Sequence, residues 1–394
     1  MASADVVEGV RAEDGSMEHF LDLYKGKCDN FGDDPHPLII KRVNDAIERG
    51  WSLYPRQQLS SLLLNGASLS EKEKIQDDDV FALSESLTAF ADASITSIDL
   101  SVNNIENNGA KALSAMMRST QTLRSLNLRA NGIGEVGGLA LAHALEGQRS
   151  IVDINLNGNP IGDAGRAFAK PMLMLTRVDL GNTEMGINAI IQIAKSMQTN
   201  TTVMELSIEN PRILTLDDEG SIHLSTMIAT NTTLTSLNLS KNRIRDQGVE
   251  WLVKGLSQNK TLRTLNLRCI ANPILSNQIG PGGAVLLAGY LSGPCSITDL
   301  DLAGNRIIDE GGKAIAGSLR TNMVLERLDL SYTSLAEPGL VALSDVVAGK
   351  TASKLNSLML WGNFFTPAAG TVFRNALSTT RLTDFDFRPL IQEE

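Results

Sequence analysis

One arrangement of apolar and polar residues recurs along most of the chain. It reads L-x-x-L-x-L-x-x-N-x-I-x-x-x-G-x-x-x-L-x-x-x-L, and its clearest copy runs from Leu234 to Leu256. The other full copies begin at Ile95, Leu123, Ile151, Leu175, Val203, Leu262, Ile297, Leu325 and Leu355. A degenerate unit at Leu59 precedes them and a truncated unit at Leu382 follows, which makes twelve units in all. Several neighbouring copies start 28 residues apart, a period typical of repeat proteins.

Each half of the unit predicts a different element. The first half, L-x-x-L-x-L, alternates apolar and polar residues and predicts a short strand with one buried face. The second half places apolar residues four positions apart and predicts a helix with one apolar face. Neither element buries that face alone, but stacked copies bury a continuous core. Because a helix is about 10 Å wide and strands lie about 4.8 Å apart, the stack must curve with the strands inside.

We therefore predict an α/β fold, a leucine-rich-repeat solenoid or horseshoe of about twelve strand units. Its parallel β-sheet should form the concave face and its α-helices the convex face. An asparagine follows most strands, at Asn103, Asn131, Asn159, Asn242, Asn277, Asn305 and Asn363. An amide donates and accepts hydrogen bonds at once, so it can join the turns of its own and the next repeat. Thr183 and Thr333 take this position in two units, where we expect looser turns.

The ends of a solenoid need caps, because terminal repeats would otherwise expose the core. HPLIIKRVNDAIERG has a helical apolar face, so we assign residues 17–55 to a helical N-terminal cap. The composition of residues 1–16 predicts disorder. Residues 56–394 should form the repeat domain, closed by a short C-terminal cap around Phe385 and Phe387.

Three units carry insertions after their strands, at residues 70–79, 210–220 and 269–275. All three should project from the rim that carries the loops following the strands. Loops of this kind often carry recognition, although the sequence assigns no role to these.

Charge and aromatic content narrow the range of partners. The formal net charge is −10, and no basic run is longer than two residues. Phosphate backbones and anionic lipids repel such a chain. Only 4% of the residues are aromatic, which argues against stacking on single-stranded nucleic acid. We expect neither nucleic acid nor a membrane as a partner.

The cysteines indicate the compartment. Cys28, Cys269 and Cys295 are odd in number and far apart, so free thiols in a reducing compartment are the simplest interpretation. The N-terminus has no secretory signal, and no apolar stretch reaches the roughly 20 residues of a membrane span. We expect an intracellular, cytoplasmic protein. Asn200 and Asn231 match the glycosylation sequon, but without secretion we interpret them as polar loop residues.

No pattern of catalytic or metal-binding residues is present. The four histidines lie at no metal-ligand spacing, and neither a nucleophile elbow nor a phosphate-binding loop occurs. Asp77–Asp79 and Asp217–Glu219 lack the alternation of a calcium loop, so we interpret them as solvated charge. We predict no catalytic residue, cofactor, metal or small-molecule substrate.

The residues between the leucines of each strand must face the inner surface, which is polar and mostly acidic. Its C-terminal third predicts a protein-binding site made of Arg268, Asp299, Asp301, Arg327, Asp329, Tyr332, Met359 and Trp361. Interface energy concentrates on Trp, Tyr and Arg. Acidic residues predict a partner with a basic surface. Trp361 could instead pack on the terminal cap as a lid, and the oligomeric state stays open.

The 28-residue unit resembles the ribonuclease-inhibitor-type class of leucine-rich repeats over about 59–390. Segments outside the shared consensus, HPLIIKRVNDAIERG, NPRILTLDDEG and LWGNFF, resemble the family of leucine-rich repeat-containing protein thirty-four. That resemblance implies an intracellular, non-enzymatic protein without cofactor or catalytic residue. It also implies associations with germ cells, the nucleolus and ciliated cells, so the nucleus or a cilium or flagellum is a possible location.

The leading hypothesis is a non-enzymatic scaffold that holds a protein partner on its concave face and loop rim. One alternative is a structural component of a large assembly such as the ciliary or flagellar axoneme. Another is regulation of a small GTPase, because Ran GTPase-activating proteins share this repeat class. Their long acidic tail is missing here, and the many cysteines of ribonuclease inhibitors are missing too.

Overall fold

The protein was examined as a computed structural model, which describes residues 17–48, 60–89, 95–213, 218–269, 277–348, 353–377, 379 and 382–386. The chain forms two compact units, Met1–Asn155 and Leu156–Glu394. Several predicted features fall outside the described residues. They are the segment 1–16, the end of the predicted cap at 49–55, residues 214–217 of the insertion at 210–220 with Asp217 of the acidic run, most of the insertion at 269–275, and Phe387.

The first unit begins with two helices, α1 (Met17–Phe31) and α2 (Pro37–Glu48). Strands and helices then alternate, as β1 (Ser60–Leu63), η1 (Glu71–Glu73), α3 (Asp77–Ala89), β2 (Ile95–Asp99), α4 (Asn107–Ser119), β3 (Ser125–Asn127), α5 (Glu135–Gly147) and β4 (Asp153–Asn155). Each strand pairs in parallel with the next one along the chain. The α1 helix packs against α3, and so covers the first repeat.

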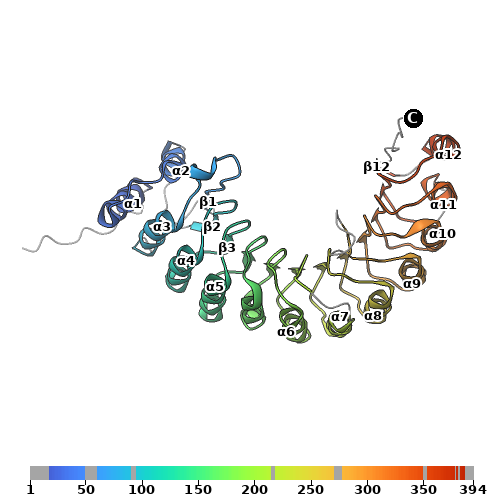
Figure 1. Ribbon diagram of the computed structural model, residues 1–394, viewed down its shortest axis with the longest axis horizontal. Coiled ribbons are helices and arrows are strands. Elements are labelled where there is room, and N and C mark those ends of the chain that lie inside the picture. Colours follow the sequence, from blue (N-terminus) through green and yellow to red (C-terminus); the bar gives the residue numbers. More distant parts are fainter. Residues whose placement is uncertain are drawn as a thin grey trace, which may run out of the picture. The chain divides into compact units, whose positions relative to one another are not determined.

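The second unit starts with two 3₁₀ helices, η2 (Gly162–Ala169) and η3 (Pro171–Met174). Its strands are β5 (Arg177–Asp179), β6 (Glu205–Ser207), β7 (Ser236–Asn238), β8 (Thr264–Asn266), β9 (Asp299–Asp301), β10 (Arg327–Asp329), β11 (Ser357–Met359) and β12 (Asp384–Asp386). Its α-helices are α6 (Ile187–Met197), α7 (Glu219–Thr230), α8 (Asp246–Leu256), α9 (Pro281–Leu291), α10 (Ile308–Leu319), α11 (Glu337–Val347) and α12 (Pro367–Leu377). Within this unit the helices lie along the outer side and the strands along the inner side (Figure 1).

The predicted leucine-rich-repeat solenoid is confirmed. The described residues form twelve strands that follow one another in sequence order, with a helix after each of β1 to β11. The repeated leucines make the core, as Leu325, Leu328 and Leu330 show, since all three are buried. Each fully buried leucine contributes about 1.5–3 kcal/mol relative to an exposed one. The core therefore runs from repeat to repeat between the strands and the helices.

The unit that begins at Ile151 departs from the predicted pattern. Its second half forms η2 and η3 instead of an α-helix. The unit is only 24 residues long, from Ile151 to the next start at Leu175. A 3₁₀ helix rises about 2.0 Å per residue against about 1.5 Å in an α-helix, so it covers the same height with fewer residues.

The insertion at 70–79 does not project as a loop over its whole length. Residues 77–79 form the first turn of α3, and only the part before them, with η1, lies outside the helix. The Asp77 carboxylate accepts hydrogen bonds from the amides of Glu106 at 2.7 Å and Asn108 at 3.1 Å. Asp77 is therefore a cap for the next helix, α4, and its interpretation as solvated charge was wrong.

The asparagines after the strands are buried and bond to two successive repeats. The Asn131 amide donates to the carbonyls of Leu128 at 2.9 Å and Leu100 at 3.0 Å, while its oxygen accepts from Ile105 N at 3.1 Å. Leu100 and Ile105 belong to the preceding repeat, whereas we expected the next one. The direction is reversed, but the predicted structural role is correct.

The two threonines at this position are buried and donate within their own repeats. Thr183 and Thr333 are buried, and each hydroxyl donates to its own strand, to Leu180 O and Leu330 O, both at 2.6 Å. A hydroxyl has a single proton, so it cannot also donate to a carbonyl of the preceding repeat. In the Thr333 turn, the side-chain oxygen of Asn363 accepts from Thr333 N at 3.1 Å. Asn363 belongs to the next repeat, so this bond joins the Thr333 turn to that repeat.

A second row of buried amides lies where each helix leads into the next strand. Its members are Gln148, Asn200, Asn231, Asn259 and Asn322. Asn231 donates to Met197 O at 2.7 Å and Asn200 O at 3.0 Å, and accepts from Leu234 N at 2.7 Å. Asn200 and Asn231 thus lie in loops, as interpreted, but they are buried and join successive repeats. A buried, bonded amide is also closed to glycosylation in the folded chain.

Asn131→Ala should lower the free energy of unfolding by about 2–4 kcal/mol, because it removes buried hydrogen bonds to the carbonyls of Leu100 and Leu128 and to the amide of Ile105. Urea unfolding followed by circular dichroism measures this change. Asn108→Ala is the control, since Asn108 is exposed on α4 and should cost under about 0.5 kcal/mol. Equal losses in the two variants would contradict a structural role for the amide.

Candidate protein-binding surface

The structure brings all eight predicted site residues together on β8 to β11 and the turns that follow them. We call them the strand-face cluster, made of Arg268, Asp299, Asp301, Arg327, Asp329, Tyr332, Met359 and Trp361. Asp329 on β10 lies in register between Asp301 on β9 and Met359 on β11. Alternate residues of a strand share a face, so Asp299 and Asp301 point away from Leu300, which is buried in the core.

The carboxylates of the cluster are paired with its own arginines. Arg268 reaches two strands, with Nη1 at 3.4 Å from Asp301 Oδ2 and Nη2 at 3.6 Å from Asp329 Oδ2. Arg327 Nε lies 3.2 Å from Asp299 Oδ2. These partly exposed pairs stabilise the fold by about 0–1 kcal/mol each. The surface is acidic, as predicted, but its arginines neutralise part of the charge.

Burial changes the acidity of two of these carboxyl groups. Desolvation raises the pKa of Asp301 to about 6, with Asp329 adding to the rise and Arg268 opposing it. Desolvation likewise raises the pKa of Asp299, against the attraction of Arg327. Asp301 Oδ1 also accepts from Ala303 N at 2.9 Å, which fixes the carboxyl group at the end of β9. The cluster therefore gains negative charge as the pH rises toward neutrality.

Two aromatic rings lie at one edge of the cluster. Tyr332 and Trp361 follow β10 and β11, and their ring centroids are 5.0 Å apart at an angle of 61°. Tyr332 is 45% exposed and Trp361 is 41% exposed. A hydrogen bond of 2.7 Å from Tyr332 N to Trp361 O joins the two turns. The pair is thus a fixed, edge-on aromatic contact that faces solvent.

The alternative position for Trp361, as a lid on the terminal repeat, is taken by other residues. Phe373 is fully buried, with Phe365 and Phe385 at centroid distances of 5.4 Å and 5.9 Å. These three rings cover the end of the core. Trp361 packs edge-on against Tyr332 and keeps a large exposed area, which supports its place in a binding surface.

The backbone of Tyr332 is in the left-handed region, with φ of 55°. Gly304 and Gly362 take the same turn position in neighbouring repeats, with φ of 75° and 74°. A bulky residue is rare in this conformation and costs on the order of 1 kcal/mol or more. Val102, Ala130, Asn182, Asn210 and Lys241 are left-handed at the same turn position, so the conformation belongs to the repeat.

Gly362 is a residue of this surface that the sequence did not indicate. A Cβ atom on Gly362 would overlap the Cδ1 and Cε1 atoms of the Tyr332 ring, so only glycine lets the ring lie across the β11 turn. The available signal was the alignment of Gly304, Tyr332 and Gly362 in one repeat position. That alignment identifies the turn, but it does not show which neighbouring residue the Tyr332 ring covers.

Within the described residues, no group of three or more His, Cys, Asp or Glu side chains is arranged to hold a metal ion. Among the helices in the described part of the chain, none has the length and apolar character needed to cross a membrane.

The parallel strands, outer helices and exposed strand face define the class of protein, a leucine-rich-repeat solenoid. A family model described as "Leucine Rich repeat" matches residues 91–114, 120–142, 230–253 and 293–316. An internalin structure from Listeria monocytogenes aligns with 96% of this chain and 99% of its own at 16% identity and a TM-score of 0.44. The fold class therefore rests on the strands and helices themselves.

Two curated relatives give the family. Leucine-rich repeat-containing protein 34 of Mus musculus is 26% identical over 219 residues, which cover 55% of this chain and 51% of the mouse protein. Ribonuclease inhibitor of Sus scrofa is 34% identical over 125 residues, covering 31% of this chain and 26% of the inhibitor. The chain is a leucine-rich-repeat protein whose repeats are similar to those of ribonuclease inhibitor. The match spans about half the length of the mouse relative.

Asp301 should make the stability of the chain fall as the pH rises. In the folded chain the Asp301 carboxyl group keeps its proton up to about pH 6. In the unfolded chain an aspartate has a pKa of about 3.9. Between these values the folded state binds more protons, so the free energy of unfolding decreases with pH. Between these pH values, the free energy of unfolding should fall by about 2 kcal/mol more in the native chain than in Asp301→Asn. Urea unfolding across this range measures it, and parallel curves for the two proteins would contradict the assignment.

Gly362→Ala should lower the free energy of unfolding by about 2–3 kcal/mol, from backbone strain and from the clash with the Tyr332 ring. In a Tyr332→Ala background the clash is gone, and about 1 kcal/mol of strain should remain. A double-mutant cycle by urea unfolding separates these contributions. Equal losses in both backgrounds would show that Gly362 does not position the ring.

Proposed function

We propose that this chain is a non-enzymatic scaffold that binds a protein partner through the strand face and loop rim of the unit Leu156–Glu394. The exposed Tyr332–Trp361 pair beside the strand-face cluster is the observation that carries this proposal. Aromatic residues and arginine are the side chains that dominate binding energy at protein interfaces. Here they are joined in one patch on adjacent strands.

The patch is prepared for binding before a partner arrives. The Tyr332 and Trp361 rings already pack on each other, and the hydrogen bond between their turns restricts the backbone. Arg268 is held between two carboxylates on β9 and β10. Ordering side chains on association costs about 0.5–1.5 kcal/mol for each one, and most of that cost is absent here.

The charge of the surface favours a partner with a basic surface. Three aspartates stand against two arginines in the strand-face cluster, and the whole chain carries a formal charge of −10. Complementary charge mainly speeds association and selects among partners. Because Asp301 has a pKa of about 6, its negative charge is complete only above that pH. Binding of a basic partner should therefore weaken as the pH falls through this value.

The family supports a binding role without naming a partner. The porcine relative is called an inhibitor of ribonuclease, so its repeats act on another protein. We place this chain inside the cell, because its cysteines, Cys28, Cys269 and Cys295, are free thiols. A permanent place in an axoneme and regulation of a small GTPase stay predictions.

Replacing both rings, Tyr332→Ala with Trp361→Ala, should weaken partner binding at least about tenfold, because the double change removes the main apolar contact. The partner is first identified by proximity labelling in the native cell and then titrated against the purified chain by calorimetry. Circular dichroism should be unchanged, since both rings are largely exposed.

Trp251→Ala is the matched control for this experiment. Trp251 lies on α8, is partly exposed, and packs under Lys254, whose Nζ is 4.1 Å from the ring centroid. It should leave the affinity unchanged, because α8 lies on the outer side of the unit (Figure 1). Unchanged affinity in the double variant would rule out the strand-face cluster as the binding site.

A further inference from the structure

A second exposed aromatic pair lies in the first unit, on the helical side. Phe31 ends α1 and Phe81 lies on α3, with ring centroids 5.3 Å apart at 89°. Phe31 is 46% exposed and Phe81 is 44% exposed. One turn away on the same two helices, Lys27 Nζ lies 3.2 Å from Glu85 Oε2. We call the Phe31–Phe81 pair and the carboxylates around it the α1–α3 patch.

The exposure of Phe31 follows from the pattern of α1. Its buried residues Phe20, Tyr24 and Cys28 form one helical stripe, and Phe31 continues that stripe to the end of the helix. The next helix does not cover it, so an apolar side chain that belongs to the packed face is left in solvent with Phe81 as its neighbour. Exposed apolar groups arranged in a cluster mark interaction sites.

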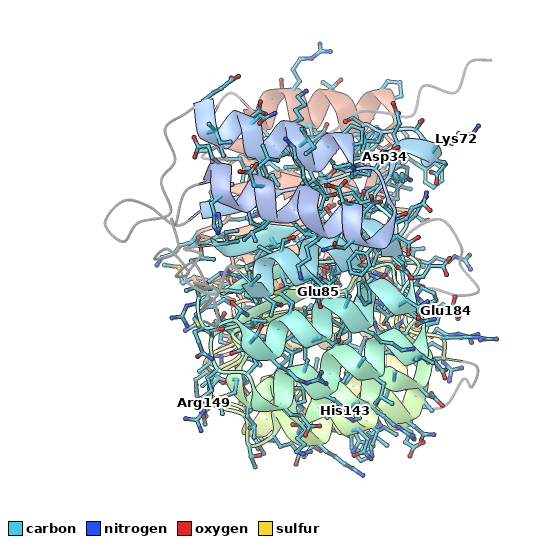
Figure 2. All side chains as sticks on the ribbon, turned by 90° about the vertical axis from the view of Figure 1, so that its left-hand side faces the viewer. Asp34, Lys72, Glu85, His143, Arg149 and Glu184 are labelled. Carbon is cyan, nitrogen blue, oxygen red and sulfur yellow. The ribbon has the colours of Figure 1, made fainter. Side chains whose placement is uncertain are left out.

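Several exposed aspartates lie close in sequence to the two phenylalanines. They are Asp29, Asp33 and Asp34 near Phe31, and Asp78 near Phe81. Burial raises the pKa of Asp79, the Gln76 amide and His36 oppose that rise, and Asp78 and Asp33 add to it. Asp33 and Asp29 likewise help to raise the pKa of Cys28, after burial. Figure 2 looks onto this end of the unit and labels Asp34 and Glu85.

The lysines of α1 are Lys25 and Lys27, and α3 has neither lysine nor arginine. Lys27 is already paired with Glu85. The nearby His36 ring accepts from Leu38 N at its Nδ1, at 3.2 Å, and so holds no proton there, while its Nε2 lies 3.0 Å from Glu73 O. His36 also opposes the rise in the pKa of Asp79. The α1–α3 patch is therefore an apolar centre with an anionic border, which repels nucleic acid and anionic lipid.

We propose that the α1–α3 patch binds a basic amphipathic helix of a protein partner. Leucine or similar side chains on one face of that helix would cover Phe31 and Phe81, and flanking lysines or arginines would pair with Asp29, Asp33, Asp34 and Asp78. A helix is favoured because α1 and α3 pack side by side and present ridges on which a third helix can lie. The site is distinct from the strand-face cluster.

The test uses the full chain and a fluorescent synthetic helix of roughly five turns, built of leucine on one face and lysine on the other. Fluorescence anisotropy measures its binding. The helix with glutamate in place of lysine should not bind, and a peptide with serine in place of leucine should bind at least about tenfold more weakly. Equal binding of all three peptides, or no binding of the leucine–lysine helix, would overturn the proposal.

Two variants of the patch locate the binding. Phe31→Ala with Phe81→Ala should weaken binding at least about tenfold. Asp33→Asn with Asp34→Asn keeps both rings and should weaken binding while reducing its dependence on salt. If the first variant disturbs the packing of α1, circular dichroism would reveal it, and the second variant would still test the proposal. Native affinity in the asparagine variant would overturn the proposal.

Two further variants exclude other sites. Val136→Ala with Leu139→Ala removes exposed apolar side chains from α5 and should leave the affinity unchanged. Tyr332→Ala with Trp361→Ala should also leave it unchanged, and loss of binding there would move the peptide to the strand-face cluster. Sedimentation of the native chain without peptide tests whether a second copy of the chain binds the α1–α3 patch. Self-association that the phenylalanine variant abolishes would replace the proposed partner with this chain itself.

Discussion

The strand and the helix of each repeat end in turns that lie inside the stack, where water does not reach the backbone. Each unbonded amide or carbonyl group there would cost about 1–3 kcal/mol. Buried amides satisfy these groups, as Asn131 does after a strand and Asn231 does after a helix. Both side chains bond to two successive repeats. The rest of the structure depends on this, because each turn is complete only when its neighbour is in place.

This repetition builds the strand-face cluster. Since each turn repeats the one before it, the strands keep a constant register, and Asp301, Asp329 and Met359 lie side by side. The same turn also sets one residue of most described repeats in the left-handed conformation. Where that residue is Tyr332 instead of glycine, an aromatic side chain is held out over the turn of the next repeat. Binding chemistry is thus obtained by changing side chains on a fixed backbone.

The two proposed surfaces share a composition. Each has an exposed aromatic pair with carboxylates around it, one on the strands and one on the helices. In the strand-face cluster, Arg268 and Arg327 neutralise part of the charge, whereas at the α1–α3 patch Lys27 is paired with Glu85. An acidic chain with two such surfaces is suited to hold basic partners, and the charge difference between the surfaces favours different ones.

The sequence alone determined the repeat, the alternation of strand and helix, the buried leucines and the set of residues that share the inner face. These follow from the periods of two and of about 3.6 residues, which are local properties of the chain. It did not determine that Asn131 bonds to the preceding repeat, that Asn200 and Asn231 are buried, or that Gly362 makes room for the Tyr332 ring. Nor did it show the pairing of Arg268 with two aspartates or the exposure of Phe31. Those features depend on which atoms of different repeats and helices come together, and only the tertiary structure decides that.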